Sequence, residues 1–191
     1  KPIINNIRRV LDLDVDLQAV EKDLQHCLTS AFPICTGIRL PGIWSMFEAG
    51  IRAILGQQIS IGAARNLVST LVTALGKLDG NKHLFPSPES IANSEIEFLK
   101  IPGSRKQTLR NLAQHYVTHE NPNDANQWLK LKGIGPWTVD YAQMRGLSHP
   151  DIFLGGDLGI KKALGKAGKD FDSKQASPWR SYLTFQLWSQ L

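Results

Sequence analysis

The stretch LKGIGPWTVDYAQMRG, residues 131–146, places two glycines around one isoleucine directly ahead of a Pro-Trp pair. Glycine is unfavourable inside a helix, and it suits places where the backbone needs a positive φ or lies close to another group. Proline suits the first position of a helix, because its missing N–H would have no partner there. The sequence therefore predicts a tight turn with an exposed backbone over 133–135, followed by a helix from Pro136 to Gly146.

The rest of the chain shows apolar residues at helical spacing, and no segment alternates convincingly as a strand. The stretch GKLDGNKHLFPSP, residues 76–88, is dense in glycine, proline and polar residues and is predicted to be a linker. Asp14 or Asp16 can cap the first helix. We expect an all-α protein, with helices over about 17–28, 47–55, 60–75, 88–93, 95–100, 104–119, 123–131, 136–146, 157–164 and 178–191.

Composition is that of an ordinary globular protein: of the 191 residues, 42% are hydrophobic and 20% charged. No apolar run approaches the ~20 residues that span a bilayer. The two cysteines, Cys27 and Cys35, indicate a reducing compartment without a disulfide framework, and they are too few for a four-cysteine iron–sulfur cluster. The net charge of +5 is compatible with an anionic partner but does not by itself indicate nucleic acid.

The turn formed by Gly133, Ile134 and Gly135 is a candidate anion site. Backbone N–H groups at a helix N-terminus, together with the helix dipole, attract phosphate, and such contacts hold DNA without reading its sequence. Lys130 and Lys132 beside the turn would strengthen that attraction. The alternative is a corner between two helices that needs glycine only for its turn, and the G-x-G pattern alone leaves both interpretations open.

A longer set of motifs favours the first interpretation. The turn is followed by DIFLGGDLGIKKAL (151–164), and RLPGIWSMFEAGIRAILGQQIS (39–60) and PWRSYLTFQLW (178–188) flank the pair. In this order, the four motifs resemble the helix-hairpin-helix/Gly-Pro-Asp superfamily of DNA glycosylases, and most of all the bacterial 3-methyladenine DNA glycosylase II group. The likeness runs from about Arg8 to the end of the chain. It leaves out the amino-terminal mixed α/β lobe of those enzymes, some of which are fused behind an alkyltransferase/transcriptional-regulator module.

The resemblance implies one glycosylase domain over 1–191, built as a two-lobed helical bundle. Lobe A is expected at about 36–118, lobe B at about 1–35 plus 119–191, and the helix-hairpin-helix motif at 129–146. It also implies a monomer in the bacterial cytosol or nucleoid, without a membrane, that acts on double-stranded DNA containing alkylated bases. The chain begins without Met, which suits a part of a longer polypeptide with a missing amino-terminal region.

The catalytic aspartate of the superfamily falls on Asp157. It would face the sugar and stabilise the positive charge that grows on the ribose, or activate water, much as a carboxylate does in glycoside hydrolysis. Asp157 also stands where a helix N-cap belongs, and without the resemblance the cap would be the preferred interpretation. The two roles are compatible.

Three aromatic residues are expected to form the base pocket. Trp137 and Tyr141 are four residues apart and so share a helix face, and Trp188 falls on a pocket aromatic of the family. Such a cleft would attract cationic alkylpurines through cation–π interactions. Superfamily members that also cut the strand carry a Schiff-base lysine where Trp137 stands, so this chain is expected to hydrolyse the glycosidic bond only.

The family also sends a side chain from the LGQQIS loop into the gap left by the flipped base. Position matching puts Gln58 there, with Gln57 and Ile59 alongside. Glutamine departs from the leucine of the nearest group, and an amide that caps the end of the preceding helix is the alternative. Gly155-Gly156 and Leu158 also depart from the family pattern, which bears on the substrate range more than on the reaction.

No redox cofactor and no iron–sulfur cluster are expected. The family binds a monovalent cation, Na⁺ or K⁺, through hairpin carbonyls, which would here be those of Leu129, Leu131 and Ile134, with a structural role. The favoured function is a monofunctional glycosylase for alkylated purines such as 3-methyladenine. The rival is a non-catalytic helix-hairpin-helix DNA-binding module of a larger repair or regulatory protein, and a weaker third option is a glycosylase for another lesion.

Overall fold

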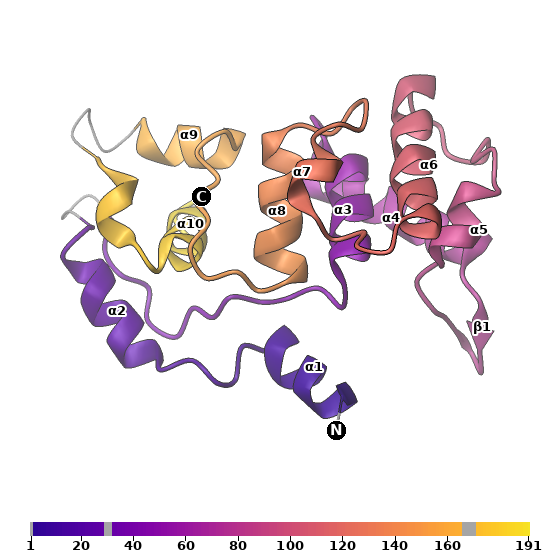
Figure 1. The fold of residues 1–191 in the computed structure, drawn as a ribbon. Coiled ribbons are helices and arrows are strands. Elements are labelled where there is room, and N and C mark those ends of the chain that lie inside the picture. Colours follow the sequence, from indigo (N-terminus) through magenta and orange to yellow (C-terminus); the bar gives the residue numbers. More distant parts are fainter. Residues whose placement is uncertain (1, 29–31, 166–170) are drawn as a thin grey trace. The chain divides into compact units, whose positions relative to one another are not determined.

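The computed structural model describes residues 2–28, 32–165 and 171–191. Its contacts divide the chain into two compact units, one formed by 1–44 with 143–191 and the other by 45–142. Figure 1 labels the α-helices of both units and strand β1. Among the described helices, none combines the length and the apolar character that crossing a membrane requires.

The first unit contains α1 (Pro2–Val10), α2 (Leu17–Gln25), α9 (Leu158–Leu164), the 3₁₀ helix η1 (Ser173–Ala176) and α10 (Arg180–Trp188). Helix α10 packs against both α9 and η1. Asp16 caps α2, because its carboxylate accepts the N–H groups of Gln18 and Ala19, which confirms one of the two predicted caps. The core of this unit includes Val20, Leu24, Leu40, Met144, Leu154, Ile160, Leu183 and Leu187.

The second unit contains α3 (Met46–Gly56), α4 (Ile61–Leu75), α5 (Pro88–Ala92), α6 (Gly103–Thr118), α7 (Ala125–Trp128) and most of α8 (Pro136–Gly146). Helix α6 packs against α3 and α5, and α3 also packs against α4. Ser60 caps α4 by accepting the Ala63 N–H at 3.2 Å, as the sequence predicts. Helix α8 has the predicted bounds.

The division of the chain differs from the expected lobes in two places, because 36–44 belongs with the first unit and 119–142 belongs with 45–118. Trp128 explains why 119–142 lies in the second unit. Its side chain is fully buried, and its Nε1–H donates to the Pro122 carbonyl at 2.7 Å. The ring lies so close to α3 that a Cβ on Gly50 would stand 2.6 Å from it, so glycine at 50 allows α7 to dock there.

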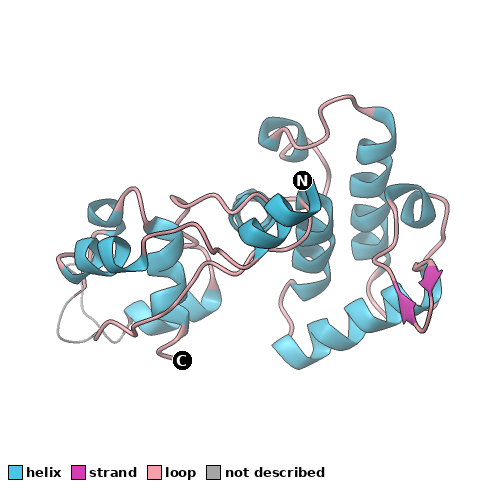
Figure 2. Ribbon diagram, turned by 90° about the horizontal axis from the view of Figure 1, so that it is seen from below, coloured by secondary structure: helices cyan, strands magenta, loops and turns pink. Residues whose placement is uncertain are grey.

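The predicted linker contains a short hairpin that the sequence did not indicate. Strands β1 (Leu78–Asp79) and β2 (Lys82–His83) pair antiparallel, drawn in magenta in Figure 2. Gly80 permits the turn with a φ of +56°. Each strand has two residues, too few for an alternating pattern to be visible, and the all-α class stands.

Other helix predictions need correction. Residues 95–100 form turns rather than a helix, because Ile96 has a φ of +56° while its side chain and that of Leu99 are buried. Burial of these two side chains therefore outweighs the helical tendency of a six-residue segment. Helix α1 was not predicted, and α7 is shorter than the predicted 123–131.

Candidate functional site

The two glycines of the hairpin between α7 and α8 serve different purposes. Gly133 has a φ of +91°, and a Cβ there would lie 2.0 Å from Thr108 Oγ1, so the fold itself requires glycine. Gly135 has no positive φ, and a Cβ there would meet nothing within 4 Å. The fold therefore does not explain the second glycine, whereas the close approach of an external ligand would.

The hairpin presents backbone donors next to positive charge. Ile134 is buried, and its N–H donates to the Leu131 carbonyl at 3.1 Å, which closes the turn. Within the described part of the chain, the N–H groups of Gly133 and Gly135 donate to no protein acceptor. Lys130 and Lys132 are exposed beside them. This arrangement suits an anion.

Helix α8 carries the predicted aromatic pair on one face. The rings of Trp137 and Tyr141 stack with centroids 5.3 Å apart and planes 25° apart, and both residues are half-buried. The shared helix face is thus confirmed. Asp140, which the sequence did not single out, is half-buried on the same helix, and this burial raises the pKa of its carboxyl group.

The loop between α3 and α4 has an exposed and strained tip. Gln58 is exposed and has a φ of +57°, a conformation that is unusual for a residue with a side chain. Ile59 is 37% exposed. Helix α3 ends at Gly56, and its C-cap residue is Gln57, whose backbone N–H donates to the Ile54 carbonyl. Across the described residues, the side-chain amide of Gln58 makes no hydrogen bond. The alternative of a capping amide at Gln58 is therefore not what the structure shows.

Gln57 lies beside the tip with its side chain directed to the hairpin. Its Nε2 donates to Thr138 Oγ1 at 3.2 Å and approaches the Gly133 carbonyl at 3.5 Å. Its own carbonyl accepts a hydrogen bond from Arg105 of α6 at 2.9 Å. The structure thus joins the loop to the hairpin within the second unit.

Asp157, in the first unit, is the N-cap of α9. Its Oδ1 accepts the N–H groups of Gly159 at 2.9 Å and Ile160 at 3.1 Å, which confirms the predicted cap. The indole N–H of Trp188 donates to the same oxygen at 3.0 Å. A Cβ on Gly159 would stand 3.0 Å from that oxygen, so the glycine leaves room for it. The contact joins two predicted site residues that are 31 positions apart.

The predicted cation site consists of the backbone carbonyls of Leu129, Leu131 and Ile134 in the hairpin. Of the three carbonyls, that of Leu131 accepts the Ile134 N–H, and a carbonyl oxygen has a second lone pair for a cation. Over 2–28, 32–165 and 171–191, no group of three His, Cys, Asp or Glu side chains is placed to hold a metal ion. The monovalent cation stays a prediction.

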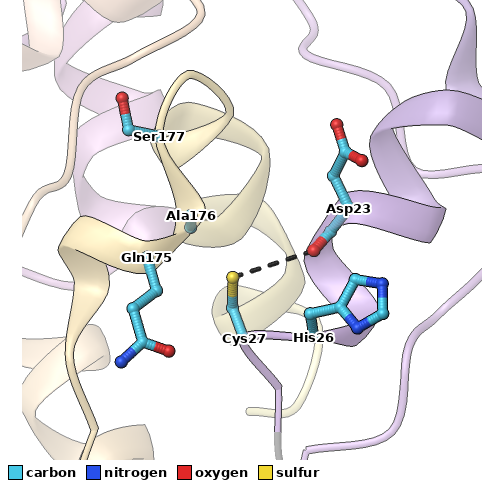
Figure 3. Close-up of a pocket in the computed structure, with 6 residues that line it drawn as sticks. All are labelled: Asp23, His26, Cys27, Gln175, Ala176 and Ser177. Carbon is cyan, nitrogen blue, oxygen red and sulfur yellow. Dashed lines mark hydrogen bonds between the residues drawn. The ribbon is translucent and has the colours of Figure 1, made fainter.

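Figure 3 draws the residues that line an open cavity, and none of the predicted site residues is among them. The cavity has a volume of about 470 Å³. It lies between the end of α2 and η1. The thiol of Cys27 points to the Asp23 carbonyl at 3.8 Å, and burial raises its pKa, which makes it a poor nucleophile. The lining residues are Asp23, His26, Cys27, Gln175, Ala176 and Ser177.

The sequence is similar to those of known DNA repair enzymes. The DNA-3-methyladenine glycosylase 2 of Escherichia coli is 33% identical over 197 residues, which cover 94% of this chain and 68% of that enzyme. The chain belongs to the DNA-3-methyladenine glycosylase 2 family. Another relative, the "Probable bifunctional transcriptional activator/DNA repair enzyme AlkA" of Mycobacterium tuberculosis H37Rv, is 34% identical over 96% of this chain, which spans only 42% of that relative.

Two further comparisons concern the amino-terminal part of the chain and the fold. A sequence model of the AlkA N-terminal domain matches residues 1–45, so the likeness begins at the first residue rather than near Arg8. The 3-methyladenine DNA-glycosylase of Archaeoglobus fulgidus shares the fold, with a TM-score of 0.75 at 18% identity over 98% of this chain and 73% of that one.

Proposed function

We propose that this chain is a DNA glycosylase that hydrolyses the N-glycosidic bond of alkylated purines such as 3-methyladenine in double-stranded DNA. The observation that carries the proposal is the anchoring of Asp157. Three N–H donors, two from the first turn of α9 and one from Trp188, converge on its Oδ1. A structural N-cap needs only the first two donors. The indole adds an orienting contact that suits a carboxylate with a further role.

That role is electrostatic. A base is inaccessible within the stack, so the enzyme flips its nucleotide out of the duplex. As the glycosidic bond breaks, positive charge grows on the deoxyribose, and a carboxylate held at a fixed position stabilises it without reorganisation. The carboxylate of Asp157 supplies the negative charge that stabilises this positive charge, or it orients the attacking water. A cationic alkylated base is already a good leaving group, so no separate general acid is required.

The other predicted residues have supporting roles. The hairpin donors and the two lysines contact a DNA phosphate, which sets the position of the protein on the duplex. The stacked rings of Trp137 and Tyr141 favour a cationic base through cation–π attraction. Gln58 fills the gap left by the flipped base. A monovalent cation at the hairpin carbonyls would stabilise the turn without taking part in the reaction.

The reaction stops after base release. Tryptophan stands at 137, and its indole has no nucleophile for a Schiff base with the abasic sugar. The product should therefore be an intact strand with an abasic site, which breaks only when alkali is added.

Single-turnover release of free 3-methyladenine from methylated duplex DNA tests the proposal. Asn at 157 keeps the oxygen that caps α9 and removes only the charge, so Asp157→Asn should fold, bind DNA and lose release by at least about a hundredfold. The matched control is Asp16→Asn, which changes the cap of α2 in the same unit and should release base normally.

Each outcome is informative. Release by wild type and Asp16→Asn only, with nicking confined to alkali-treated DNA, supports the monofunctional glycosylase. Salt-sensitive duplex binding without release by any of the three proteins would instead support a non-catalytic DNA-binding module. Nicking without alkali would contradict the absence of lyase activity.

A further inference from the structure

The loop over 57–60 is held at several points while its tip stays exposed. Arg105 Nη2, from the first turn of α6, donates to the Gln57 carbonyl at 2.9 Å. The Gln57 side chain donates to Thr138 Oγ1 in the first turn of α8. On the far side, Ser60 caps α4. Helices α4, α6 and α8 therefore each make a hydrogen bond with the loop over 57–60.

This anchoring explains how Gln58 keeps its backbone conformation. A positive φ costs a residue with a side chain on the order of 1–3 kcal/mol, and it persists only where the surroundings impose it. The neighbouring residue supplies that constraint, because Gln57 is fixed through both its carbonyl and its amide. The strained backbone thus belongs to Gln58, the exposed residue that the family pattern places in the space left by the flipped base.

The hairpin is attached to the same framework. The hydroxyl of Thr108 in α6 has a single proton, which is shared between the Lys132 carbonyl at 3.2 Å and the Ser104 carbonyl at 3.0 Å, and the side chain lies against Gly133. Helix α6 thus contacts the loop through Arg105 and the hairpin through Thr108. Thr138 is 2% exposed, so its hydroxyl is available to the protein rather than to DNA.

We propose that Gln57 and Arg105 are positioning residues that fix the loop tip relative to the phosphate-binding hairpin. Gln58 then enters the duplex at a fixed distance from the phosphate that the hairpin binds, so that insertion needs no reordering of the loop. This inference rests on the proposed function. It removes Gln57 from the residues expected to touch DNA, because its amide nitrogen is directed to Thr138.

The charge of Arg105 raises a competing interpretation, direct contact with a phosphate. No carboxylate pairs with Arg105 within the described ranges, and its hydrogen-bond partner is a neutral carbonyl. The two roles differ in their dependence on salt. A phosphate contact contributes about 0.9 to the slope of log K against log salt, whereas a contact to an internal carbonyl contributes nothing.

The experiment measures binding to two duplexes, one intact and one with a tetrahydrofuran abasic analogue, at several salt concentrations. An orphan 2-aminopurine opposite the analogue reports insertion by its fluorescence. Gln57→Ala, Arg105→Ala and the isosteric Thr138→Val should each reduce the preference for the abasic duplex about fivefold, as expected when a single hydrogen bond is removed. Affinity for the intact duplex and its salt slope should not change.

Additional variants separate positioning from folding and from charge. Gln57→Ala/Thr138→Val should lose no more than the larger single effect, since both substitutions break the same bond. Arg105→Lys should restore much of the preference, because lysine can still donate. Gln107→Ala, at an exposed glutamine of α6 that bonds Asn111, is the matched control and should behave as wild type.

An unchanged abasic preference in Gln57→Ala and Thr138→Val would overturn the inference. So would a salt slope lowered by about 0.9 in Arg105→Ala, or an equal loss of affinity for both duplexes in the single variants. A wild type that releases 3-methyladenine but shows no preference for the abasic duplex would overturn the inference alone. If wild type releases no 3-methyladenine, the proposed function has failed, and the inference falls with it for that separate reason.

Discussion

One carboxylate oxygen of Asp157 accepts hydrogen bonds from a helix cap and from an indole, and these contacts can be separated by mutation. Trp188→Phe keeps an aromatic ring against the site and removes the N–H that reaches Oδ1, together with the extra bulk of the indole. Since the two backbone donors remain, the helix cap persists while the carboxylate loses one orienting contact. We expect single-turnover release of 3-methyladenine to fall about five- to tenfold, with duplex affinity unchanged.

The control for this prediction lies in the same unit. Trp179 also donates its indole N–H to an aspartate, Asp23 Oδ2 at 2.9 Å, and Asp23 is not a predicted site residue. Trp179→Phe should cost similar stability in urea unfolding and leave base release unaffected. Equal losses of release in the two variants would assign the effect of Trp188 to folding.

The glycines at 133 and 135 support a second prediction at this scale. Gly133→Ala forces a Cβ into Thr108 and strains a positive φ, so it should lower the free energy of unfolding by about 2 kcal/mol or more. Gly135→Ala meets open space and should leave stability nearly unchanged while weakening duplex binding. Urea unfolding and duplex titration measure the two effects, and full duplex binding by Gly135→Ala would contradict a phosphate contact there.

The sequence predicts contacts between side chains only where the partners are close neighbours along the chain. The Asp157 cap follows from a polar residue at the start of an apolar helical stripe, and the shared helix face of Trp137 and Tyr141 follows from their spacing. The Trp188 contact to Asp157 and the Gln57 contact to Thr138 join distant segments. No periodicity reports such pairs, and for the same reason Arg105 and Thr108 were not predicted.

At the element scale, the start of α10 depends on a residue outside the helix. Asp151 accepts the Arg180 backbone N–H and two hydrogen bonds from the Arg180 guanidinium, together with one from Ser177. These contacts, with the Arg180 side chain foremost, lower the pKa of Asp151 to about 2 from its ordinary 3.8. The pair therefore fixes the element that carries Trp188.

The pH dependence of this contribution follows from the direction of the shift. A carboxyl group with a lowered pKa in the folded state stabilises the fold above its ordinary pKa, and it loses that contribution as the pH falls through about 2. Asp151→Asn should thus lower the free energy of unfolding by about 1–2 kcal/mol at pH 7, after allowance for partial exposure. In urea titrations the gap to wild type should shrink between pH 4 and pH 2.

A comparison with Asp14 makes this prediction specific. Asp14 also pairs with an arginine, Arg8, but both side chains are mostly exposed. Solvent screens such a pair, so Asp14→Asn should have little effect at either pH. A gap for Asp151→Asn that stays constant with pH would show that the ion pair does not carry the stabilisation.

Elements were predicted well where the sequence marks their ends. Pro136 and Gly146 bound α8, and Ser60 and Gly76 bound α4, because these residues have strong positional preferences at helix termini. Residues 95–100 carry no such marks, and packing of Ile96 and Leu99 decides their conformation. In α1 the isoleucines are largely exposed, so its apolar spacing does not correspond to a buried face of the described structure.

For the whole molecule, the net charge of +5 did not by itself distinguish a DNA-binding protein from many others. Two of the positive charges lie at the hairpin, because Lys130 and Lys132 are exposed beside the N–H groups of Gly133 and Gly135. If these lysines contact phosphates, association should depend on salt through them, while the chemistry of a bound lesion should not. Different residues of the chain would then contribute to DNA binding and to catalysis.

The double variant Lys130→Gln/Lys132→Gln tests this separation. Its slope of log K against log salt for duplex DNA should be shallower than that of wild type by up to about 1.8, because each lysine that no longer neutralises a phosphate removes about 0.9. Release of 3-methyladenine at saturating protein should stay at the wild-type rate. Lys77→Gln/Lys82→Gln removes the same charge from the exposed β hairpin and should leave the slope unchanged. If both double variants lowered the slope equally, the duplex would be responding to net charge, and the phosphate contact would not belong to the helix-hairpin-helix motif.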